Sequence, residues 1–171
     1  MYIESLSIAT LEQAIHLREE VFPGVSNSSD SPSLAASLYR DKYAQWFSNS
    51  GITQLNYWVA IDEKSFQVIG LTGLYCKSED EQEADWLGWF CVASQFRGKG
   101  IGKELLDFTI DLAQAKAKRY LRLYTWEHPS SYVARMLYLK RGFYQIGESP
   151  NKSGFKTIYL ELQLDSIIHS G

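Results

Sequence analysis

A glycine-rich segment lies between an expected strand and an expected helix, and its glycines occupy alternate positions: Gly98, Gly100 and Gly102. Because glycine has no Cβ atom, such a loop turns its backbone N–H groups toward a ligand and lets that ligand touch the backbone. The first turn of the following helix adds unpaired N–H donors and the positive end of the helix dipole. Cationic side chains stand in the same segment at Arg97, Lys99 and Lys103. Together these features predict a cradle for a pyrophosphate group.

Two common phosphate-binding motifs do not fit this segment. A P-loop reads GxxxxGK followed by Ser or Thr, whereas Gly102 and Lys103 are followed by Glu104. The dinucleotide-binding fingerprint reads GxGxxG, whereas this run reads GxGxG and lies in the middle of the chain. Taken alone, the segment is also compatible with a glycine turn that only starts a helix.

A second motif follows the next expected strand. The segment ARMLYLKRGF spans residues 134–143, and it is similar to the pattern A-x-x-x-Y-x-x-x-G-F of the GNAT superfamily of N-acetyltransferases. The glycine-rich segment resembles the acetyl-CoA-binding pattern of the same family, Q/R-x-x-G-x-G/A. The two motifs stand in the family's order, and the resemblance covers about residues 56–162.

The resemblance implies an α/β (α+β) fold: a single GNAT-like domain over residues 1–171 with a mixed, mostly antiparallel central sheet flanked by helices. It also implies an acyltransferase that moves an acetyl group from acetyl-CoA to a primary amine of a small molecule such as an amino acid or a polyamine. Two alternatives stay open: transfer to a protein or peptide, and a non-catalytic module of this fold that only binds acetyl-CoA.

The same resemblance assigns roles in binding acetyl-CoA. Backbone groups of Phe90, Cys91 and Val92 would pair with the pantetheine arm like an added strand, and the Val92 N–H or a neighbour would polarise the thioester carbonyl. Ser131 stands where the family often has Asn, and its shorter side chain weakens that contact. The full predicted set is Phe90, Cys91, Val92, Arg97, Gly98, Lys99, Gly100, Ile101, Gly102, Lys103 and Ser131.

Tyr138 is the tyrosine of the second motif, and the resemblance gives it the task of protonating the departing CoA thiolate. A thiol has a pKa near ~8.5 and a tyrosine near ~10, so complete proton transfer is uphill by about 2 kcal/mol. Partial transfer or hydrogen bonding in the transition state is still worth about 10²-fold in rate. A core aromatic is the alternative role for this residue.

An acceptor amine must also lose a proton, because an alkylammonium has a pKa near ~10.4 and no lone pair. Many family members place a carboxylate on the strand before the glycine loop, and here the nearest acids are Asp85 and Glu83. Glu127 and His128, which follow the next strand, are rivals. Each of the four is also compatible with a solvated loop charge.

Two further features concern the acceptor. Residues 79–85 carry five acids, which would attract a cationic acceptor or simply solubilise a hairpin tip. Tyr39, Tyr43 and Trp46 recur at helical spacing, which suits either a core stripe or the lining of an acceptor groove.

Periodicity and turn residues predict the elements that position these groups. Thr10 and Gln13 form an expected capping box at the start of the first helix. The expected strands span residues 2–9, 57–62, 67–76, 86–93, 120–126, 143–149 and 155–164. The expected helices span residues 10–22, 34–47 and 102–118, with a short one from Ser130 or Ser131.

Composition narrows the function classes. The net charge of −3 has the wrong sign for a general nucleic-acid binder. Cys76 and Cys91 are expected to be buried free thiols, and neither they nor the three histidines have metal-ligand spacing, so no metal site is expected. No stretch approaches the ~20 apolar residues of a membrane span, and the start lacks signal-peptide features. We therefore expect a cytoplasmic protein, as a monomer or homodimer.

Overall fold

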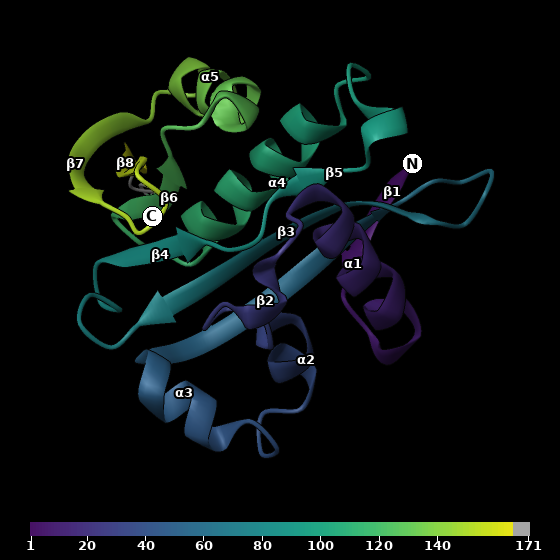
Figure 1. Cartoon of the computed structure of the whole chain (residues 1–171), viewed down its shortest axis with the longest axis horizontal. Coiled ribbons are helices and arrows are strands. Elements are labelled where there is room, and N and C mark those ends of the chain that lie inside the picture. The colour runs from purple at the N-terminus through teal and green to yellow at the C-terminus, as the bar shows by residue number, and fades with distance from the viewer. Residues whose placement is uncertain (166–171) are drawn as a thin grey trace, which may run out of the picture.

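A twisted sheet runs through the molecule with helices on both of its faces, as the computed structural model of residues 1–165 shows (Figure 1). The strands are β1 (Tyr2–Ser5), β2 (Ile52–Ile61), β3 (Val68–Lys77), β4 (Ala84–Leu87), β5 (Cys91–Val92), β6 (Tyr120–Trp126), β7 (Tyr144–Pro150) and β8 (Lys156–Gln163). The helices are α1 (Ile8–Val21), α2 (Ser33–Leu38), α3 (Ala44–Ser50), α4 (Ile101–Ala115) and α5 (Tyr132–Lys140). Single 3-10 turns lie at Val25–Asn27, Ser94–Phe96 and Pro129–Ser131.

The sheet has the strand order β1-β2-β3-β4-β6-β8-β7, with β5 paired to β3. Only β4 and β6 run parallel, and every other pairing is antiparallel. The mixed, mostly antiparallel sheet of the expected α/β fold is therefore confirmed. The domain limits at residues 1 and 171 stay a prediction, because residues 166–171 lie outside the described part of the chain.

Apolar side chains on the two faces of the sheet form separate cores. One core joins α1, α2 and α3 to side chains such as Leu71 and Trp86. The other joins α4 and α5 to side chains such as Leu121 and Leu123. β3 lies between the two cores, and all its residues before Lys77 are buried.

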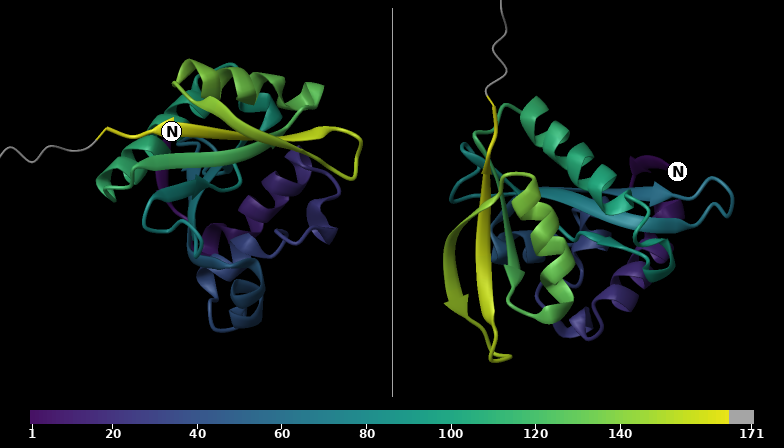
Figure 2. Two further views of the ribbon diagram at one scale, coloured as in Figure 1. Left: turned by 90° about the vertical axis from the view of Figure 1, so that its left-hand side faces the viewer. Right: turned by 90° about the horizontal axis from the view of Figure 1, so that it is seen from above.

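The parallel pairing between β4 and β6 is short, and this shapes the centre of the sheet. It joins Ala84–Trp86 to Tyr120–Arg122 and then stops. Beyond that point β5 pairs with β3, while β6 continues along β8 as far as Trp126. Figure 2 shows β6, β8 and β7 running at a steep angle to β2 and β3. We call the open interval between β5 and β6 the strand split.

The strand expected over residues 86–93 is interrupted. β4 ends at Leu87 and β5 begins at Cys91, so residues 88–90 belong to no strand. Gly88 still donates its N–H to the carbonyl of Gly73 at 2.8 Å, whereas Trp89 and Phe90 donate to no backbone carbonyl within the described residues. Apart from the Gly88 bond, the interruption removes residues 88–90 from the hydrogen-bond ladder with β3.

The helix expected over residues 34–47 is two helices. α2 ends at Leu38, and α3 begins only at Ala44. The polar run Arg40-Asp41-Lys42 between them has no apolar side chain to bury, and the Arg40 guanidinium instead lies 4.1 Å from the centre of the Phe47 ring. Helical spacing in the sequence did not reveal this break.

The first helix begins two residues earlier than expected, at Ile8. Its capping residues are Ser7 and Thr10, with the Ser7 N–H donating to Thr10 Oγ1 at 3.1 Å. The capping box expected at Thr10 and Gln13 is therefore wrong. Gln13 Oε1 instead accepts the Val68 N–H at 3.0 Å, which ties α1 to β3.

Candidate functional site

The backbone of Val92 faces the strand split. Ala93 donates its N–H to the Ile69 carbonyl at 2.9 Å, so its backbone groups face β3. Because consecutive residues of a strand direct these groups to opposite edges, those of Val92 face away from β3. Arg97 Nε donates to the Val92 carbonyl from that side, at 3.1 Å. The split therefore contains a strand edge to which an extended ligand can pair.

The glycine loop closes one end of this edge. Gly98 and Gly100 have φ angles of +75° and +83°, and a Cβ atom at either position would meet no atom within 4 Å. Gly100 is the N-cap of α4, so the first N–H groups of the helix have no intrahelical acceptor. The geometry suits an anion that touches the backbone from the open side.

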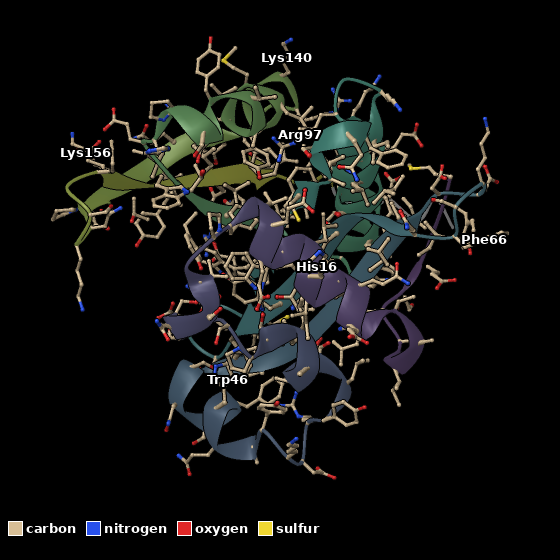
Figure 3. All side chains as sticks on the ribbon, turned by 45° about the vertical axis from the view of Figure 1, so that its right-hand side comes forward. His16, Trp46, Phe66, Arg97, Lys140 and Lys156 are labelled. Atoms are coloured by element: carbon tan, nitrogen blue, oxygen red, sulfur yellow. The ribbon has the colours of Figure 1, made fainter. Side chains whose placement is uncertain are left out.

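Gly102 lies between α5 and β5, which border the site on its two sides. A Cβ atom there would lie 3.7 Å from Leu137 of α5 and 3.7 Å from Val92 of β5. Figure 3 shows Arg97 between α5 and the loop that leads into α4. Arg97, Lys99 and Lys103 are all exposed, and Lys99 Nζ lies 4.8 Å from the centre of the Phe96 ring.

Tyr138 lies inside the core of α4 and α5 with only 5% of its surface exposed. Its ring centre is 5.8 Å from those of Phe90 and Phe143. The hydroxyl makes no hydrogen bond with any described residue, although it is not among the fully enclosed unpaired atoms. Burial, and then the charge of Cys91, raises the pKa of Tyr138, so the hydroxyl stays protonated.

Ser131 is the N-cap residue of α5, and its side chain makes no capping hydrogen bond. The turn before the helix is held by its neighbours instead: Ser130 donates its N–H to His128 Nδ1 at 3.1 Å. The Ser131 hydroxyl is thus available to a ligand at this end of α5.

Asp85 is fully buried, far from the solvated loop position considered from sequence. Its Oδ1 accepts from Lys116 Nζ at 2.8 Å and from Cys76 Sγ at 3.0 Å, and its Oδ2 has no partner within residues 1–165. Lys116 is the C-cap of α4, whereas the glycine loop lies at the opposite end of this helix. Both cysteines are buried free thiols, as expected, and burial raises the pKa of Cys76 to about 11.

Lys116→Met is expected to lower the free energy of unfolding by about 2 kcal/mol, because it leaves a buried carboxylate without its cation. Lys116 keeps a third of its side chain exposed, so the loss is smaller than for a fully buried pair. Urea unfolding measures the effect, with Lys64→Met as the exposed control. Equal stability of both variants would contradict a structural role for the pair.

The acidic segment 79–85 is largely neutralised by cations. Arg122 lies 2.7 Å from Asp80, 3.5 Å from Glu83 and, on its other side, 2.7 Å from Glu161. Glu79 lies 4.0 Å from Lys77. The segment therefore presents a weaker field to a cationic acceptor than five unpaired acids would. About half of the Glu83 side chain stays exposed.

The rival bases lie at the end of β6. The His128 ring packs against Trp126 and Phe155, with ring centres 5.7 and 4.8 Å apart, and its Nδ1 lies 2.7 Å from Ser130 Oγ. Glu127 is exposed, and its backbone N–H pairs with the Lys156 carbonyl. Glu83 and Asp85 thus lie at the start of β4, whereas the two rival bases follow the end of β6, at the other end of this part of the sheet.

A contact that the sequence did not reveal lies on the face of the sheet that bears α1 and α2. Tyr124, on the part of β6 beyond the parallel pairing, donates its hydroxyl to Asp30 Oδ2 at 2.6 Å. Asp30 belongs to residues 28–32, a polar loop without periodicity. Trp46 of the aromatic stripe supports this loop by donating to the Ser29 carbonyl at 2.7 Å (Figure 3). This arrangement depends on contacts between residues that are far apart in the sequence.

Comparisons with known proteins establish the family. A family model described as an acetyltransferase (GNAT) domain matches residues 53–145. Because this is more than half of the chain, the protein belongs to the GNAT acetyltransferase family, as the two motifs predicted. No curated protein matches the chain by sequence.

Solved structures share the whole fold at low sequence identity. A GNAT-family acetyltransferase from Staphylococcus aureus has a TM-score of 0.71 and 21% identity, with 96% of this chain and 99% of that chain covered. An aminoglycoside 6'-N-acetyltransferase complexed with coenzyme A has a TM-score of 0.70 and 16% identity over 96% and 98%. The NatC complex bound to Gag peptide and CoA has a TM-score of 0.70 and 22% identity over 96% and 98%.

None of the helices in residues 1–165 combines the length and apolarity that crossing a bilayer requires. Within the same residues, no three His, Cys, Asp or Glu side chains converge in a way that could hold a metal ion.

Proposed function

We propose that this protein is an acetyl-CoA-dependent N-acetyltransferase that acts on a primary amine of a small molecule. The unpaired edge at Val92, which leads directly into the open glycine loop, is the observation that carries the proposal. An extended pantetheine arm needs such an edge, and a pyrophosphate needs such a loop. Coenzyme A is present in two of the structures that share this fold.

Binding would begin with a change of partner at Val92. Its carbonyl accepts from Arg97 in the free protein, and the pantetheine amide would replace that bond. Arg97 would then turn to the pyrophosphate, where a guanidinium pairs well with phosphate oxygens. The Val92 N–H would remain to stabilise the oxyanion that forms when the amine attacks the thioester carbonyl.

In the transfer step the amine nitrogen forms a bond to the carbonyl carbon, and the carbon–sulfur bond breaks. The thiolate receives a hydrogen bond or a proton from Tyr138. The proton of the amine leaves to water, or through water to Glu83, whose side chain keeps solvent access but lies beside Arg122 at the start of β4, away from the strand split. Asp85, the other predicted base, is sealed against Lys116 and is better placed to stabilise the fold.

The Asp30–Tyr124 contact favours a small acceptor. It joins the loop after α1 to β6 across the acceptor face, by which we mean the face that bears α1 and α2. A peptide acceptor would need the space between this loop and β6 to be open. A small amine needs only the space beside the contact. We also keep a cytoplasmic location, where acetyl-CoA and reduced thiols occur together, as part of the proposal.

A thiol-release assay tests this function. Wild-type protein with acetyl-CoA is expected to release free CoA when alkylamines, diamines or amino acids are added, and to do so more slowly with peptides. Acetyl-CoA binding without release for any amine would instead identify a non-catalytic binding module. Acetylated peptide detected by mass spectrometry as the main product would move the assignment to a peptide N-acetyltransferase.

A further inference from the structure

We propose that Asp30 is the residue that recognises the acceptor, by binding a positively charged group of the incoming amine. This inference rests on the proposed N-acetyltransferase function and adds the substrate class, a cationic amine. Its basis is a carboxylate that is fixed in place beside the strand split and lacks a cationic partner.

The loop that carries Asp30 is held by side chains from α1, α3, β2 and the interruption at residues 88–90. Both neighbours of Asp30 are fixed through their carbonyls: Arg18 of α1 donates to Ser31, and Trp46 of α3 donates to Ser29. The Ser33 hydroxyl lies 3.1 Å from the Tyr57 hydroxyl and accepts from Trp89 Nε1 at 2.9 Å. An irregular loop held in this way presents its acid at a defined position, as ligand recognition requires.

Anchoring this loop with Arg18 costs folding free energy, because a charged side chain is buried. Only 3% of its surface is exposed, burial lowers its pKa, and its Nε has no hydrogen-bond partner in the described part of the chain. Its guanidinium also lies 5.6 Å from the centre of the Trp89 ring, in the interruption between β4 and β5. One buried cation therefore links the loop to the Trp89 side chain.

The Asp30 carboxylate retains binding capacity. Oδ2 accepts from Tyr124, whereas Oδ1 accepts no hydrogen bond, and no cation lies within 4.0 Å, among residues 1–165. By contrast, Asp80 has Arg122 as its partner and Asp85 has Lys116. An acid held beside the reaction region without a cation is suited to binding one from the substrate.

The surroundings of Asp30 also suit an ammonium group. Burial, followed by the charges of Tyr124 and Asp30, raises the pKa of Tyr75. Burial raises the pKa of Tyr57 to about 12, with Asp30 contributing in the same direction. The charge of Asp30 thus reaches the hydroxyls of Tyr57 and Tyr75, and the carboxylate accepts a hydrogen bond from the hydroxyl of Tyr124 directly. A carboxylate attracts an ammonium group through its full opposite charge.

Asp30→Asn is expected to raise the KM for a diamine acceptor, one nitrogen of which reacts while the other stays cationic, about tenfold, while the KM for acetyl-CoA changes less than about twofold. Asp30→Glu keeps the charge and is expected to recover part of the loss. Asp41→Asn is the matched control, because Asp41 is exposed and its side chain makes no hydrogen bond or ion pair with a described residue. A purely structural role for Asp30 would lower the melting temperature and affect both substrates.

A binding measurement separates this inference from the proposed activity. A tertiary alkylamine is cationic at neutral pH but has no N–H to lose after attack, so it tests charge recognition without turnover. Titrated into the protein saturated with CoA, it is expected to bind wild type and Asp41→Asn equally, and Asp30→Asn about tenfold more weakly. Equal binding to all three proteins, or to none, would overturn the inference. Absence of turnover with every amine would instead overturn the proposed function.

Discussion

Tyr138→Phe is expected to lower kcat about 10²-fold and to leave the affinity for acetyl-CoA nearly unchanged. Phenylalanine keeps the ring that packs between Phe90 and Phe143 and removes only a hydroxyl that has no hydrogen bond in the free protein. The loss should therefore fall on the step in which the thiolate leaves. Steady-state kinetics and a melting temperature for the variant provide the measurement.

The apolar surroundings strengthen this expectation. Burial raises the pKa of Tyr138, which taken alone makes it a weaker acid. The same surroundings penalise a thiolate, and burial raises the pKa of the neighbouring Cys91 thiol to about 12. A CoA thiolate released there would gain in basicity too, so the proton transfer does not become correspondingly harder.

A pH profile adds an independent readout. Because the pKa of Tyr138 is raised, its neutral form persists above the usual tyrosine range near ~10. The wild-type kcat should therefore show no decline from Tyr138 ionisation up to about pH 10. Full activity of Tyr138→Phe would show that the hydroxyl has no catalytic role. A lowered melting temperature with normal kcat would give Tyr138 a packing role instead.

The parts of the site that were predictable from sequence are local ones. Gly98, Gly100 and Gly102 stand within five residues, and helix α4 starts directly after the N-cap glycine. Both positive φ angles occur at residues whose lack of a Cβ atom permits them. The mixed, mostly antiparallel sheet followed from the family resemblance, since alternation alone does not define which strands pair.

The parts that were missed depend on contacts between distant segments. Asp85 reads as a loop acid in sequence, and only its contact with Lys116, 31 residues later, explains its burial. Asp30 lies 94 residues from Tyr124 in a stretch without periodicity. The break between α2 and α3 likewise reflects the polar run at residues 40–42 and the packing of Arg40 on Phe47. Spacing rules describe one element at a time, so they do not register such pairs.

The glycine loop gives the second large effect. Gly102→Ala is expected to weaken acetyl-CoA binding about 30-fold or more, a loss of about 2 kcal/mol. The residue is the second of α4, and a Cβ atom in a helix tilts toward the N-terminus, which is the side of the predicted pyrophosphate. The new methyl group would also enter the interval between Val92 and Leu137, along which the pantetheine arm would run.

This variant tests the cradle more cleanly than a change at Gly100. Gly100 has a φ of +83°, so a branched residue there would strain the backbone with or without a ligand. At Gly102 the added Cβ atom makes ordinary contacts at 3.7 Å, and alanine favours the helix by up to about 1 kcal/mol. The melting temperature should therefore stay the same or rise while calorimetry records weaker acetyl-CoA binding. Gly147→Ala, whose Cβ atom would lie 3.9 Å from Tyr159, is the control away from the split. If Gly102→Ala binds acetyl-CoA as tightly as this control, the pyrophosphate does not lie at the start of α4.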